Sequence, residues 1–130
     1  LNAESGSIHL TLDDGLLHLI CSRGIPAPVQ SLVRHVPVGK GMAGLAVERR
    51  GPVTACNIQT DTSGDVRPGA KATGLEGAIV VPIFDDHDGV VGALGVANRA
   101  ARTFTPQETV RLIDHGRAIA RARLGIKAQG

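Results

Sequence analysis

Two hairpins constrain the fold of this chain more than any other feature of its sequence. Residues 7–12 alternate polar and apolar side chains, an Asp-Asp-Gly turn follows, and residues 16–22 are largely apolar. A second pair of apolar segments, residues 77–84 and 90–97, is separated by a short loop that ends in Asp-Gly. Each pattern predicts two strands joined by a tight turn. Such strands are antiparallel, which argues against a repeated strand–helix–strand fold.

Two helices and a further strand complete the predicted order. A Gly-Lys-Gly sequence leads into a helix over residues 42–50, a Gly-Pro pair ends it, and residues 53–58 form a strand. Residues 27–38 leave room for only a short helical turn before Pro37. The sequence therefore predicts one α+β domain over residues 1–130, with no internal repeat and no linker.

The last helix has the clearest start. Thr105 has the chemistry of an N-cap, Pro106 occupies the first helical position, and Glu108 completes a capping box. We expect the helix to run to about Leu124, where Gly125 ends it.

Composition argues against several classes of partner. The formal charge of +2 is too small to indicate nucleic acid, and the absence of Tyr and Trp removes the stacking platforms of single-strand binders. No apolar run approaches the roughly 20 residues that cross a bilayer. We therefore expect a cytoplasmic protein with no direct contact to nucleic acid or membrane.

Two short motifs resemble chemical sites and have simpler explanations. Residues 39–44 contain a GxGxxG pattern, but a dinucleotide site needs these glycines after a buried parallel strand, and Pro37 does not fit a central strand. The glycines are better explained by a tight helix entry and close packing. Residues 85–88, Asp-Asp-His-Asp, fit an exposed hairpin turn better than a metal site. We predict no metal and no cofactor.

The cysteines and histidines show no catalytic grouping. Cys21 and Cys56 lie within apolar, strand-like runs, so we interpret them as small buried side chains. His9 and His18 fall on opposite strands of the first hairpin, where we expect a surface pair.

The order of these elements resembles the GAF domain family. The resemblance is carried by residues 38–46, 50–53, 77–83 and 91–96, and by Asn98-Arg99 with Phe104 and Gln107-Glu108. It implies a GAF/PAS-like central antiparallel sheet of about five or six strands flanked by helices, with a ligand pocket covered by a short helix and long loops. The chain starts almost at its first strand, without the helix that usually precedes this strand in the family, so we expect a fragment of a larger regulator.

The resemblance also suggests where a ligand would bind. We expect residues 59–76 to cover the pocket and residues 42–47 to form its roof. The candidate ligand-binding residues are Met42, Cys56, Arg67, Ile79, Val81 and Ala93. Among them, Arg67 suits an anionic group, although a salt bridge with Asp61 or Asp65 explains it equally well.

Two functions remain open, and neither is catalytic. The first is a sensory domain that binds an unknown small molecule and relays the signal to an output domain. The second is a homodimerisation module with a vestigial pocket, because the apolar arc of the last helix, which includes Leu112 and Ile119, is wider than packing on one sheet requires. A wide core face explains this arc equally well. Free methionine sulfoxide reduction, an activity within the family, needs several cysteines, and residues 59–76 contain none.

Overall fold

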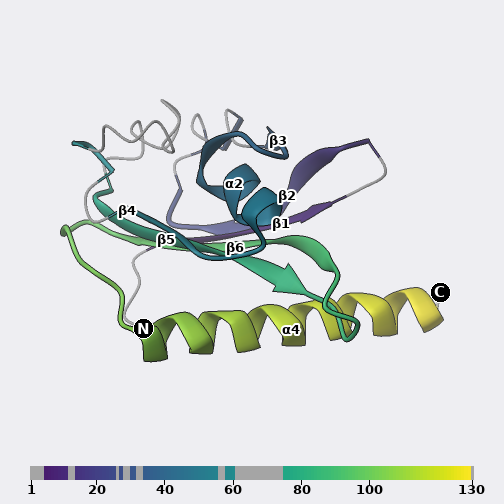
Figure 1. Ribbon diagram of the computed structural model, residues 1–130. Coiled ribbons are helices and arrows are strands. Elements are labelled where there is room, and N and C mark those ends of the chain that lie inside the picture. Colours follow the sequence, from purple (N-terminus) through teal and green to yellow (C-terminus); the bar gives the residue numbers. More distant parts are fainter. Residues whose placement is uncertain are drawn as a thin grey trace.

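Among the residues that the structure describes, the chain forms a six-stranded antiparallel sheet with a helix packed on each face (Figure 1). A computed structural model describes residues 5–11, 14–25, 27, 30–31, 34–55, 58–60 and 75–129, with side chains as far as residue 122. The strands follow the order β3-β2-β1-β6-β5-β4, and all five pairings are antiparallel. The elements are β1 (Ser5–Thr11), β2 (Leu16–Arg23), β3 (His35–Pro37), α2 (Gly41–Arg49), β4 (Val53–Ala55), β5 (Gly77–Phe84), β6 (Val90–Asn98) and α4 (Pro106–Gln129). The predicted α+β class and antiparallel sheet are confirmed.

The two hairpins form as the sequence predicts. Strand β1 pairs with β2 and strand β5 with β6, and the strand ends lie within two residues of the predicted ones. Strand β3 was not predicted, because it has only three residues and ends in Pro37. A proline is compatible with β3 because this strand lies at the edge of the sheet.

Helix α4 begins with the predicted capping box. The Thr105 hydroxyl accepts a hydrogen bond from the Glu108 N–H at 3.1 Å, and the Glu108 carboxylate accepts one from the Thr105 N–H at 3.0 Å. The predicted end at Gly125 is wrong, since the helix continues to Gln129. A glycine inside a helix costs only about 1 kcal/mol relative to alanine, so it weakens a helix without having to end it.

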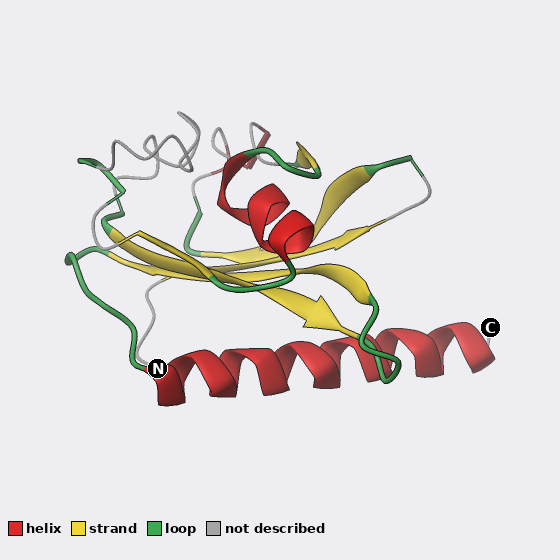
Figure 2. Ribbon diagram, in the orientation of Figure 1, coloured by secondary structure: helices red, strands yellow, loops and turns green. Residues whose placement is uncertain are grey.

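Helix α4 runs along one face of the sheet (Figure 2), and the side chains between helix and sheet form a closely packed cluster. Leu112 of α4 is 2% exposed and packs in one cluster with Ile79, Val81 and Ile83 of β5, while Ile119 packs against the same cluster. Leu112 therefore belongs to the core of the domain. At Leu112, the apolar arc predicted from the sequence packs on the sheet of the same chain and does not form a contact surface for a second subunit.

The two ends of the segment over residues 59–76 are tied together. The Ile58 N–H donates to the Glu76 carbonyl at 2.6 Å, and the Gln59 side-chain amide donates to the Leu75 carbonyl at 2.8 Å. Residues 61–74, for which we predicted a cover over the pocket, lie outside the described residues. Both ends of this segment therefore meet beside the start of β5.

Within the described part of the chain, no helix combines the length and the apolar character needed to cross a bilayer.

Candidate ligand-binding site

A cavity of about 140 Å³ lies between helix α2 and the sheet, on the face opposite α4. Strands β1, β5 and β6 form its floor, the start of α2 forms its roof, and Ile58 and Leu75 line its side. Its walls are predominantly apolar, as expected for a small-molecule site. The cavity thus lies between a short helix and the sheet, which is the arrangement that the resemblance to GAF domains implied.

Small side chains create the space in the floor. Opposite residues of an antiparallel pair lie on the same face of a sheet. Ala78 pairs with Ala97, and Val80 pairs with Gly95, and all four residues line the cavity. Because three of these four residues are alanine or glycine, their small size leaves space between the sheet and α2.

One strand supplies the polar groups. Ser5, Ser7 and His9 of β1 follow each other at every second residue, and all three line the cavity. His9 is only 4% exposed. Two hydroxyls and an imidazole thus form a row of hydrogen-bonding groups along one wall of the cavity.

The roof depends on glycine. Gly39 and Gly41 have φ angles of 88° and 66°, a region that disfavours other residues, and they turn the chain from β3 into α2. A Cβ atom at position 44 would lie 2.3 Å from the Pro37 carbonyl oxygen. Helix α2 can approach β3 this closely only because residue 44 is glycine. The GxGxxG pattern therefore serves a tight entry and close packing, as predicted.

The structure brings only part of the predicted site together. Met42 is buried on α2 and lines the cavity. Ile79 and Val81 were placed on the wrong face, because they point toward α4 and pack with Leu112. Ala93 lies opposite His9 and Pro82 on the α2 side of the sheet, but the cavity does not reach it. Cys56 and Arg67 lie outside the described residues.

Two interpretations of single residues are corrected. His9 does not form a surface pair with His18, because the register of the β1–β2 hairpin sets His9 opposite Leu19 and His18 opposite Leu10, and His9 is buried. His18 instead contacts His35, at 4.8 Å between ring centroids, and Asp14, at 2.7 Å from Nε2 to Oδ2. Cys21 is exposed, not buried.

The Asp-Asp-His-Asp segment forms the predicted exposed turn between β5 and β6. The Asp85 side chain accepts hydrogen bonds from the N–H groups of Gly89 and His87, which lower the pKa of its carboxyl group. Asp86 and Asp88 form ion pairs with Arg121 and Arg117 of α4, at 2.9 Å in each case. Among the described residues, no group of three His, Cys, Asp or Glu side chains is arranged to hold a metal ion.

Sequence comparison agrees with this geometry, since residues 1–120 match the GAF domain family. The chain is a GAF domain. A comparison with curated proteins found no match. Among solved structures, the GAF domain of a phosphoenolpyruvate-protein phosphotransferase from Coxiella burnetii is 21% identical, with a TM-score of 0.78 over 98% of this chain and 76% of that one.

Two further structures show the range of proteins that share the fold. A domain of a putative two-component sensor histidine kinase protein from Sinorhizobium meliloti 1021 is 15% identical, with a TM-score of 0.76 over 99% of this chain and 84% of that one. The fRMsr of Staphylococcus aureus, in complex with substrate, is 26% identical, with a TM-score of 0.71 over 93% of this chain and 72% of that one. Solved free methionine-R-sulfoxide reductases thus share this fold with domains of signalling proteins.

Proposed function

We propose that this GAF domain is a non-catalytic sensory domain, which binds a small, predominantly apolar molecule in the α2 cavity and passes the signal to an attached output domain. The cavity itself carries the proposal. It is comparable in size to engineered apolar cavities of about 150 Å³ that hold benzene. The β1 row of Ser5, Ser7 and His9 would orient one polar group of the ligand. With no Tyr or Trp in the chain, the site offers little stacking to large flat ligands.

The position of Cys21 favours binding over reduction. Thiol-based reduction of a sulfoxide needs one thiolate to attack sulfur and a second thiol to resolve the product. The chain has two cysteines, and Cys21 is exposed on β2 and does not line the cavity. At most one thiol of this chain is therefore available at the cavity, which leaves a reductase cycle without its resolving partner.

Self-association through α4 is a second candidate. The last turns of α4 extend beyond the β5–β6 turn (Figure 1), and Val110 on this helix is 56% exposed. Such a dimer would use the outer side of α4, because the inner side packs on the sheet. Sedimentation at rising protein concentration tests it, and a monomer at every concentration would contradict it.

Thermal-shift screening against a metabolite library tests the sensory function. A ligand at a hundred times its Kd stabilises the folded state by about 2.7 kcal/mol, so we expect one class of small apolar compounds to raise Tm. Ala43→Leu, at a roof residue that lines the cavity, should abolish the shift.

Ala118→Leu is the matched control. It adds the same atoms at an exposed residue of α4 and should leave the shift unchanged. The proposal fails if no compound class raises Tm in the wild type, or if the shift survives in Ala43→Leu.

A further inference from the structure

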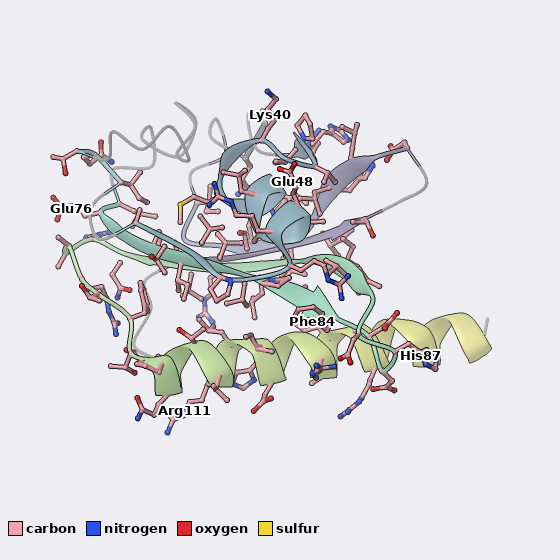
Figure 3. All side chains as sticks on the ribbon, viewed as in Figure 1. Lys40, Glu48, Glu76, Phe84, His87 and Arg111 are labelled. Carbon is pink, nitrogen blue, oxygen red and sulfur yellow. The ribbon has the colours of Figure 1, made fainter. Side chains whose placement is uncertain are left out.

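The turn between β5 and β6 is contacted by both helices, although the sheet lies between them. Helix α2 packs on one face of the sheet and α4 on the other (Figure 2). Phe84 lies at the end of β5, between the sheet and α4, and His87 lies on the turn beyond it (Figure 3). Around this turn, side chains from the two helix layers reach the same two residues, Phe84 and Asp88.

From the cavity side the contact is made by Arg50. This residue caps the C-terminus of α2 in the left-handed conformation, with φ of 55°, and its N–H bonds back to the last turn of the helix. Its guanidinium donates to the Asp88 carbonyl at 2.5 Å and lies 5.8 Å from the centroid of the Phe84 ring. The end of α2 is thus fastened to the turn.

From the opposite side the contact is made by Arg117 of α4. Its Nη1 donates to the Asp85 carbonyl at 3.0 Å, and its Nη2 donates to the Asp88 carboxylate at 2.9 Å. The same guanidinium lies 5.3 Å from the Phe84 ring centroid. Asp88 is therefore bonded through its carbonyl to Arg50 and through its carboxylate to Arg117.

The turn is held in shape by hydrogen bonds of its own. Besides its two side-chain bonds, Asp85 donates its N–H to the Gly89 carbonyl at 2.9 Å and accepts the Asp88 N–H at 3.2 Å. Four hydrogen bonds within five residues hold the loop in one shape. Arg50 and Arg117 are consequently joined through one hydrogen-bonded loop.

We propose that the Arg50–Phe84–Asp88–Arg117 cluster couples the cavity to α4. The proposal rests on the proposed sensory function, because a ligand would displace the roof at Gly41, Met42 and Ala43. Helix α2 has nine residues, about 13 Å of rigid rod, with the cavity at its first turn and Arg50 after its last. Occupancy of the cavity shifts the rod, and the turn transfers that shift to the middle of α4.

Hydrogen exchange of the full chain tests the coupling without a ligand. Ala43→Leu acts as a covalent occupant of the cavity, and we expect it to change the protection of α4 amides at residues 117–121 by about five-fold, at the low end of known coupling strengths. In an Arg50→Gln background the same substitution should leave these amides unchanged, because the link from α2 to the turn is broken.

Arg121→Gln is the matched control. It removes an Arg–Asp pair between α4 and the same turn, and among the interactions recorded for Arg121 in the described chain none reaches Phe84 or α2. The α4 response to Ala43→Leu should persist in this background. A response of equal size in the Arg50→Gln background, or none in the wild type, would overturn the proposal.

A reciprocal experiment does not depend on Ala43. Arg117→Gln on α4 should lower the protection of amides in α2, whereas Arg121→Gln should not; equal effects of the two substitutions would contradict the coupling. The sensory function is judged separately by the metabolite screen. If the exchange experiments show coupling between α2 and α4 but no compound raises Tm, only the sensory function is refuted. If a compound raises Tm but the exchange experiments show no coupling, only the proposed coupling is refuted.

Discussion

The two faces of the central sheet are built from the same strands but are packed differently. Beneath α4, strand β5 presents Ile79, Val81 and Ile83, which are fully buried against the helix. Beneath α2 the same strand presents Ala78 and Val80, and a cavity remains. A long helix thus closes one face, while a nine-residue helix leaves the other incompletely filled.

The size of alternate side chains along β5 determines which face of the sheet packs closely against its helix and which leaves a cavity. In a strand, successive residues point to opposite faces, so one segment can place large residues on one side and small ones on the other. Close-packed interiors leave few spaces larger than a water molecule, which makes an apolar cavity of this size a feature that needs explanation. We read the α4 face as the source of stability and the α2 face as the place for function.

Leu112→Glu should have the largest effect on stability, because it places a charge in the closely packed core beneath α4. An unpaired charge buried in that core costs several kcal/mol, comparable to the whole stability of a small domain. We expect loss of the cooperative unfolding transition by circular dichroism.

Val110→Glu provides the control on the same helix. Because Val110 is 56% exposed, this substitution should change stability by no more than about 0.5 kcal/mol. A folded monomeric Leu112→Glu variant would show instead that this side of α4 is a subunit interface.

Val81→Ala and Val80→Ala compare the two faces with identical chemistry. Val81 is fully buried under α4, and its truncation leaves a new void, so we expect a loss of about 2.5 kcal/mol. Val80 already borders a cavity, and we expect a loss of about 1 kcal/mol. Urea midpoints measure both, and equal losses would mean that the two faces are equally packed.

Substitutions at the N-caps of α4 and α2 should show a smaller difference in stability. Thr105→Ala removes the side-chain cap of α4 and should cost about 1 kcal/mol. Lys40, the N-cap residue of α2, makes no side-chain cap, so Lys40→Ala should leave the denaturation midpoint nearly unchanged. Coincident midpoints for wild type and Thr105→Ala would show that the capping box does not stabilise α4.

Local chemistry was sufficient to predict most of the fold. Turn residues, strand alternation and the Thr105 capping box each act over a few residues, and each predicted its element. Strand β3 and the end of α4 were missed because neither depends on a local signal. The first is defined by its pairing with β2, and the second by a helix that continues through Gly125.

The floor of the site was harder to predict, for a physical reason. Residues 77–84 are apolar almost throughout, because both faces of this strand are covered, and a strand without polar alternation does not reveal which side each residue faces. Ile79 and Val81 were therefore assigned one position away from Ala78 and Val80. The size of the side chains was the signal that could have identified the floor, since alanine and glycine at positions 78, 95 and 97 share one face of the sheet.

The contact between Gly44 and Pro37 sets the clearance above the floor. Gly44 does not line the cavity, yet any side chain there would strike the Pro37 carbonyl and lift α2 away from β3. The height of the space between α2 and the floor is thus set by a residue that does not line it.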